Sequence, residues 1–349
     1  MSMANSLTPG AAKTGGASVS AADPRLIKIL LHTPLSGPVS FLLLAEDRGY
    51  LREHGLSVAF TEGKGAAGIV PQVRSPTFDA GYGDMTALIE VIANSAPNQG
   101  PVAIYTTFNS VPFTVAVPAD GPVREPKDLE GGALSGYSVD AALLTFDMFA
   151  RATGIDASTV EIIRSPETMG VQVRDMLNGN GVRGVFGFVN TIVAMAAEFG
   201  IDGRKDLRFL TYAHYLPDMY GNGLFVTREL YERDKPGLKG MVHAFNRALR
   251  DTVRDPDVAI DALMRRAPAA MREVDRTRLV GTMRSDMGNV EGARIGVGDM
   301  DNARLARMID LVVSAKKLPR TPSVGEVFDR SFLPPDEERI RDMAEQSWQ

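Results

Sequence analysis

Short apolar runs alternate with longer segments of helical periodicity from residue 26 onward. The predicted strands of this first block are "LIKILLH", "LSVAFTEG", "FDAGYGD" and "VAIYTTFNS". Between them, apolar residues recur every three to four positions over 38–55 and 85–95, which predicts helices. Strands that alternate with helices at this spacing indicate an α/β fold with a parallel, doubly wound sheet.

The same alternation begins again near residue 113. The predicted strands of this second block are "PFTVAVPADGP", "ALSGYS", "VEIIRS", "GVRGVFGF" and "LRFLTYAHYL". The segment "GNGLFVTRELYE" then has the form of a strand that returns to the first block, and from about residue 236 the pattern is nearly all helical. We therefore predict two lobes, 26–112 with 222–349 and 113–221, and a helical C-terminal segment.

Two lobes joined by two crossing segments favour a ligand site between them. In open α/β sheets, ligands bind at the carboxyl ends of strands, where helix N-termini also converge. The sequence therefore predicts that the functional side chains follow strands or lie in strand-to-helix turns.

Composition narrows the classes of partner. Hydrophobic residues make up 44% and charged residues 23% of the 349 residues, as in soluble globular proteins. A net charge of -5 argues against nucleic acid or an anionic membrane as the main partner. There is no cysteine, which excludes disulfides, cysteine-ligated metals and thiol nucleophiles. We expect no cofactor and no metal site.

The first 25 residues are rich in Ala, Gly and Ser, which predicts a disordered tail. They contain no apolar stretch of ~7 to 15 residues, so no intact secretory signal is predicted in this chain. The small residues of "ASVSAA" resemble those beside a cleavage site. A tail left beside a removed leader and a tail unrelated to secretion both stay open.

Several phrases resemble a known family. "GYLREHGLSVAF", "FDAGYGDMTALIE", "EPKDLEGGALSG", "ARATGIDASTVEII" and "GVFGF" are similar, in matching order over most of 26–250, to periplasmic substrate-binding proteins of ABC importers. The most similar group includes nitrate, taurine, alkanesulfonate and thiamine-pyrimidine binding proteins. The resemblance implies a two-lobed type II periplasmic-binding-protein fold, a periplasmic location, an ABC permease as partner, and a monomer that binds a small molecule.

The family resemblance also includes an enzyme branch, the eukaryotic thiamine-pyrimidine synthases. Those enzymes use a cysteine-rich segment and a histidine, and this chain has no cysteine. We therefore expect a binding protein rather than an enzyme. A synthase-like enzyme and an alkanesulfonate or nitrate binder stay as alternatives.

Asp84 lies where a predicted strand passes into a helix. As an N-cap it would accept a backbone N–H from the first helical turn, which contributes ~1 kcal/mol. As a cleft residue it would favour an amine, amide or hydroxyl donor over a bare anion. The two roles are compatible, because one carboxylate oxygen can cap the helix while the other faces the ligand.

The other predicted ligand-binding residues share positions at strand ends, in turns or in the crossing segments. They are His32, Thr33, Ser36, Gly65, Tyr82, Phe108, Asn109, Ser135, Tyr137, Ser138, Phe188, Asn190 and Tyr220. A histidine at a strand end also bonds to backbone, and Asn190 also suits a helix cap. Aromatic residues in this set favour a flat, partly apolar ligand, such as an aromatic acid or an aminopyrimidine, over a small inorganic ion.

Overall fold

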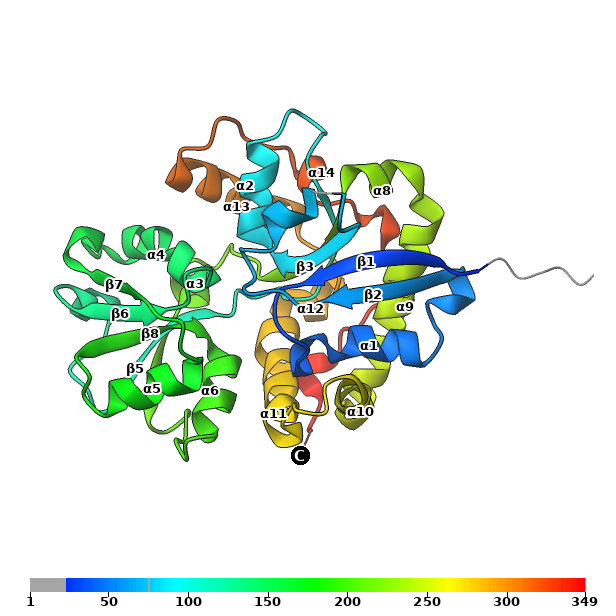
Figure 1. Ribbon diagram of the computed structural model, residues 1–349. Coiled ribbons are helices and arrows are strands. Elements are labelled where there is room, and N and C mark those ends of the chain that lie inside the picture. The colour runs from blue at the N-terminus through cyan, green and yellow to red at the C-terminus, as the bar shows by residue number, and fades with distance from the viewer. Residues whose placement is uncertain (1–22, 75, 349) are drawn as a thin grey trace, which may run out of the picture.

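The computed structural model describes residues 23–74 and 76–348, and these form two lobes side by side (Figure 1). Each lobe is built around a sheet of five strands with helices on its faces. Of the predicted N-terminal tail, residues 1–22 lie outside the described residues, and Arg25 already begins the first strand.

The first lobe contains the sheet with strand order β2-β1-β3-β10-β4. Its strands are β1 (Arg25–Leu31), β2 (Leu56–Thr61), β3 (Ala80–Asp84), β4 (Val102–Thr106) and β10 (Asn222–Val226). β1 is parallel to β2 and β3, whereas β10 is antiparallel to β3 and β4. The sheet is therefore mixed rather than parallel, because β10 enters it from the other lobe and runs against its neighbours.

The helices of this first block are shorter than predicted. They are the 3-10 turns η1 (Gly37–Val39), η2 (Arg52–His54) and η3 (Val70–Arg74) and the helices α1 (Ser40–Asp47) and α2 (Met85–Ala93). The single helix predicted over 38–55 is thus wrong, since η1, α1 and η2 divide that span. Its predicted end is correct: Gly55 adopts φ 68°, a left-handed conformation that glycine adopts without steric strain.

The second lobe contains the sheet with strand order β7-β6-β8-β5-β9. Its strands are β5 (Phe113–Pro118), β6 (Ala133–Gly136), β7 (Glu161–Arg164), β8 (Val182–Phe188) and β9 (Leu207–Thr211). Its helices are η4 (Pro126–Leu129), α3 (Ala141–Leu144), α4 (Phe146–Thr153), η5 (Ala157–Thr159), α5 (Met169–Leu177), α6 (Val189–Ala197) and α7 (Tyr212–Tyr215). β5 pairs antiparallel with β8 and β9, so this sheet is mixed as well.

The C-terminal part is helical, as predicted, and covers the first lobe. Its elements are α8 (Arg228–Arg233), α9 (Lys235–Arg254), α10 (Pro256–Arg266), α11 (Arg272–Thr282), the π-helix η6 (Met283–Met287), α12 (Val290–Ile295), α13 (Asn302–Lys316), α14 (Val324–Val327), η7 (Arg330–Phe332), η8 (Asp336–Glu338) and η9 (Met343–Glu345). α1 packs against α9 and α10. α11 reaches the other lobe and packs against α6 (Figure 1).

One partly buried arginine contacts both segments that connect the lobes. Arg304, on α13, donates from Nη1 to the Asn109 carbonyl at 2.8 Å and from Nη2 to the Met219 carbonyl at 2.7 Å. The same guanidinium pairs with Glu291 at 3.2 Å and lies 4.0 Å over the ring of Tyr220. Because Asn109 and Met219 lie on different crossing segments, Arg304 fixes the spacing between the two connections.

We predict that Arg304→Leu lowers the free energy of unfolding by about 3 kcal/mol, because it removes the cation paired with the partly buried Glu291 and both hydrogen bonds to the crossing segments. The matched control is Arg307→Leu, one turn further along α13, whose pair with Asp218 is largely exposed and should contribute under ~1 kcal/mol. Urea denaturation measures both. Equal effects of the two substitutions would contradict the role assigned to Arg304.

Candidate functional site

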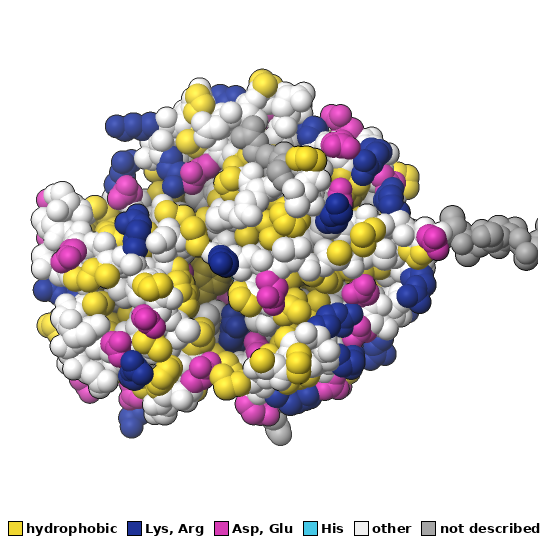
Figure 2. Space-filling model, in the orientation of Figure 1, with side chains coloured by type: hydrophobic (Ala, Val, Ile, Leu, Met, Phe, Trp, Pro, Cys, Tyr) yellow, Lys and Arg dark blue, Asp and Glu magenta, His cyan; other side chains and the backbone are white. Residues whose placement is uncertain are grey.

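A cavity of about 910 Å³ lies between the two lobes, in the size range of small-molecule sites. The space-filling view shows the hollow between the lobes, with hydrophobic and basic side chains around its mouth (Figure 2). Residues of both lobes line the cavity, and α11 supplies part of one wall. A solute inside it would therefore contact both lobes at once.

Seven of the predicted site residues line this cavity. They come from the end of β1, from the loop after β2, from the turn after β6 and from the end of β8: His32, Thr33, Ser36, Gly65, Tyr137, Ser138 and Phe188. Strand ends of both sheets thus converge on one space, as expected for an α/β architecture.

The other seven predicted residues do not belong to the cavity wall. They are Tyr82, Asp84, Phe108, Asn109, Ser135, Asn190 and Tyr220, all buried in the protein. Several have clear structural partners: the Ser135 hydroxyl donates to Gln172 at 2.6 Å, and the Tyr220 hydroxyl donates to Glu291 at 2.5 Å. For these seven residues, contact with a ligand stays a prediction that the geometry does not support.

Two roles were predicted for Asp84, an N-cap and a ligand contact, and the structure shows the N-cap. Its side chain is fully buried, and Oδ2 accepts the backbone N–H of Ala87 at 2.8 Å, which caps α2. Burial raises the pKa of Asp84 from 3.8 to about 7, more than its hydrogen bonds to the backbone lower it. The carboxyl group thus stabilises the helix start beneath the cavity.

Two nearly parallel rings from opposite lobes line the cavity. The His32 imidazole and the Phe188 ring have centroids 6.5 Å apart and planes inclined by only 15°. Burial, followed by the charge of Arg278, lowers the pKa of His32 to about 3, so the imidazole is neutral. The remaining wall is largely apolar, with Met169, Met195 and Val274 among its residues. Such a wall suits a solute with a flat, apolar part.

The sequence analysis did not identify the residues that α11 contributes. Asp275 and Arg278 both line the cavity, one helical turn apart on the same face. Arg278 approaches Asp275 at 3.5 Å and the Thr191 hydroxyl at 3.4 Å, and its Nε–H has no hydrogen-bond partner. The local sequence "REVDRTR" has the mixed charge of a solvated helix face, so no pattern in it indicates a cavity wall.

Gly65 brings the loop after β2 against the opposite lobe. It adopts φ 126°, and a Cβ at this position would lie 2.6 Å from the carbonyl oxygen of Val139. A residue with a side chain would therefore meet the other lobe's backbone, which cannot rotate away. Gly65 is a point of direct contact between the lobes at the edge of the cavity.

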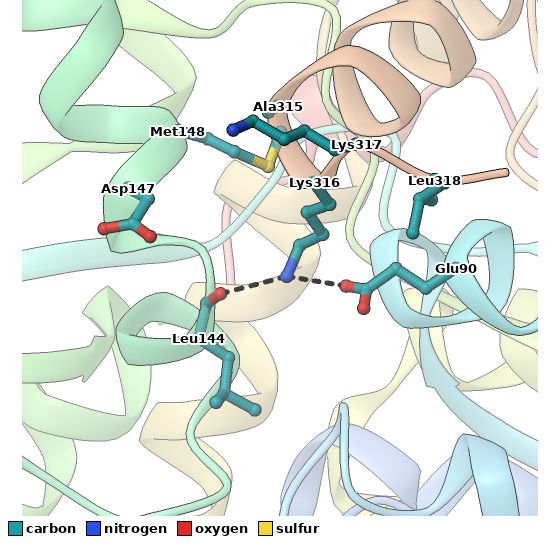
Figure 3. Close-up of a pocket in the computed structure, with 8 residues that line it drawn as sticks. All are labelled: Glu90, Leu144, Asp147, Met148, Ala315, Lys316, Lys317 and Leu318. Atoms are coloured by element: carbon teal, nitrogen blue, oxygen red, sulfur yellow. Dashed lines mark hydrogen bonds and ion pairs between the residues drawn. The ribbon is translucent and has the colours of Figure 1, made fainter.

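A second contact between the lobes surrounds a smaller pocket (Figure 3). Lys316, at the end of α13, binds Glu90 at 2.7 Å and donates to the Leu144 carbonyl of the other lobe at 3.2 Å. Arg151 donates in the opposite direction, to the Ala315 carbonyl at 3.1 Å. Because α3 runs from the cavity residue Asp140 to Leu144, one helical turn links the cavity to this contact.

No group of three or more His, Asp or Glu side chains suited to a metal ion occurs among residues 23–74 and 76–348. In the same ranges, no helix combines the length and apolar character needed to span a bilayer.

These features define a two-lobed α/β fold with an open cavity between its lobes. A family model described as NMT1/THI5 like matches residues 38–259, so the chain belongs to this family. Among curated proteins, none matches the chain significantly.

Solved structures share the fold at low sequence identity. The alkanesulfonate-binding protein SsuA of Xanthomonas axonopodis pv. citri, bound to MOPS, has a TM-score of 0.65 and 15% identity, and the match covers 89% of this chain and 100% of that chain. The periplasmic aliphatic sulphonate binding protein SsuA of Escherichia coli has a TM-score of 0.63 and 15% identity, and the match covers 89% of this chain and 94% of that chain. The predicted type II periplasmic-binding-protein fold is thus confirmed.

One similar structure is a DszB mutant, with a cysteine replaced by serine, in complex with biphenyl-2-sulfinic acid. Its TM-score is 0.58 at 13% identity, and the match covers 88% of this chain and 97% of that chain. DszB is a desulfurization enzyme, so the fold occurs in binding proteins and in an enzyme.

We predict that Asp84→Asn changes stability in a pH-dependent way. Between about pH 4 and 7, folded Asp84 keeps a proton that the unfolded chain releases, so the wild type loses stability as the pH rises. Asn cannot titrate but still caps α2. The stability of Asp84→Asn relative to the wild type should therefore increase over this window in urea denaturation.

The control is Asp156→Asn, an exposed cap whose carboxyl has a lowered pKa because of its bonds to Ser158. Its stability relative to the wild type should fall as the pH rises through the acid range, the opposite sign. A difference for Asp84→Asn that does not change with pH would contradict the burial of a titrating carboxyl.

Proposed function

We propose that the protein captures a small organic solute between its two lobes and delivers it to an ABC permease. The observation that carries this proposal is the cavity of about 910 Å³ lined from both lobes. Membership of the NMT1/THI5-like family and the fold of the SsuA proteins support it. Location in the periplasm and action as a monomer belong to the same proposal.

Capture works through closure of the lobes. A solute that contacts both lobes stabilises the closed arrangement by the difference in its affinity for the closed and open states. The contacts of Gly65 with Val139 and of Lys316 with the Leu144 carbonyl exist only while the lobes are together. These contacts stabilise the closed arrangement without filling the cavity. The permease recognises the outer surface of the closed form.

We further propose that the solute contains a ring, as in an aromatic acid or an aminopyrimidine. A flat ring between two others needs about 7 Å, twice the ~3.5 Å contact distance of carbon atoms. The His32 and Phe188 rings are nearly parallel, with centroids 6.5 Å apart, and a movement of the lobes that separates their planes to about 7 Å would admit a ring between them. The Met-containing wall adapts to varied apolar shapes.

An enzyme related to thiamine-pyrimidine synthases or to DszB is the alternative. Activation of a hydroxyl nucleophile needs a base within hydrogen-bond reach. Ser36 and His32 both line the cavity, but the Ser36 hydroxyl and His32 Nδ1 have no hydrogen-bond partner. The chain also has no cysteine to supply a thiolate. The described cavity therefore favours binding over covalent chemistry.

A thermal-shift screen with aminopyrimidines and aromatic carboxylates tests the ring preference. A bound solute at ~100 times its dissociation constant should raise the stability of the folded state by ~2.7 kcal/mol. Phe188→Ala should weaken binding about tenfold, because an aromatic contact contributes ~0.5 to 1.5 kcal/mol beyond area burial. Phe199→Ala, at the surface of the same lobe against Arg174, is the matched control. Unchanged binding of the ring compound to Phe188→Ala would contradict a solute ring bound between His32 and Phe188.

A further inference from the structure

A carboxylate of the protein already occupies an anion-binding position in the cavity wall. The Gly37 backbone N–H donates to Oδ1 of Asp275 at 2.8 Å, and the guanidinium of Arg278 forms an ion pair with the same oxygen at 3.5 Å. Asp275 is 5% exposed and lines the cavity from α11. One amide and one guanidinium are the donors that would otherwise receive a solute's carboxylate or sulfonate.

The position of Asp275 is fixed by packing as well as by hydrogen bonds. Ser36 precedes η1 but makes no capping hydrogen bond, so the Gly37 amide is capped by a residue 238 positions away. A Cβ at Gly37 would lie 1.9 Å from the Asp275 carbonyl oxygen, so only glycine allows η1 to approach α11 this closely. This contact holds the backbone of Asp275 against η1 and so places its carboxylate beside the Gly37 amide.

Arg278 is the least exposed cation of the described cavity wall, and it already pairs with a carboxylate of the protein. Arg278 is 14% exposed and pairs with Asp275, and Glu198 of the opposite lobe also acts on it. The other basic residues of the described wall, Lys64 and Arg164, are exposed at the rim, where water and salt screen them. A solute anion placed at depth would thus meet Asp275 before it gained a cation.

We propose that Asp275 is a specificity-determining residue that occupies the anion position of the cavity and excludes solutes with a buried carboxylate or sulfonate. The inference rests on the proposed function, since it assumes that solutes bind in this cavity. It narrows the solute to a ring compound whose deep end is uncharged or carries hydrogen-bond donors. Specificity then arises partly from repulsion of the wrong solute.

The test is a calorimetric titration of ethanesulfonate into the wild type, Asp275→Ala and Asp275→Asn. Asp275→Ala removes the carboxylate and frees the Gly37 amide and Arg278. Asp275→Asn removes the charge but keeps an acceptor for the Gly37 amide. It therefore tests the loss of charge in case Asp275→Ala fails to fold. We expect ethanesulfonate to bind Asp275→Ala at least about tenfold more tightly than it binds the wild type, a difference equivalent to ~1.4 kcal/mol.

The matched control is Glu273→Ala, which removes one negative charge from the exposed part of the same helix. It should not acquire ethanesulfonate binding, whereas Asp275→Asn should gain part of the effect of Asp275→Ala. Binding of ethanesulfonate to the wild type as tight as to Asp275→Ala would overturn the inference. So would a gain that Glu273→Ala reproduces, because it would reflect net charge alone.

A titration of the wild type with an aminopyrimidine, run in parallel, separates this inference from the proposed function. Binding of the ring compound without any gain for ethanesulfonate in both Asp275 variants would leave the proposed function intact and overturn the role of Asp275. A gain for ethanesulfonate with no ring compound bound by the wild type would support the role of Asp275 and count against the ring preference.

Discussion

The spacing between two crossing segments governs how the lobes meet, and a single guanidinium holds that spacing. Arg304 donates to a carbonyl of each segment, and its pair with Glu291 keeps its charge compensated in a partly buried position. The cavity, the Gly65 contact and the Lys316 contact all lie between the lobes that these two segments connect.

Two buried carboxyl groups at the cavity have partners within the protein itself. Asp275 binds the Gly37 amide and Arg278, and Asp84 caps α2 beneath the wall instead of entering the cavity. His32 stays neutral because burial and the nearby Arg278 oppose its protonation. What a solute meets is therefore mainly an apolar surface with two near-parallel rings and a pre-formed ion pair. This environment distinguishes solutes by shape and by charge at the deep end.

Hydrophobic periodicity predicted the two-lobed α/β fold, because alternating strands and helices have local signatures. The strand ends also identified His32 and Phe188, since strand ends of both sheets converge on the cavity. Periodicity did not reveal that β10 and β5 run antiparallel to their neighbours, because strand direction depends on how the chain crosses between lobes. Nor did it identify Asp275 or Arg278, whose helix lies far along the chain from the first strand and reaches the cavity only through tertiary packing.

The central claim is that the lobes hold a solute jointly, and the most direct test compares two glycine substitutions by calorimetric titration of a ring solute. Gly65 and Gly131 both have positive φ, so alanine strains the backbone at either position, but only at Gly65 would its Cβ meet the opposite lobe. We predict that Gly65→Ala weakens binding at least about tenfold, for which ~1.4 kcal/mol of strain in the closed state suffices. Gly131→Ala should bind like the wild type. Equal affinity of Gly65→Ala and Gly131→Ala would contradict capture by closure.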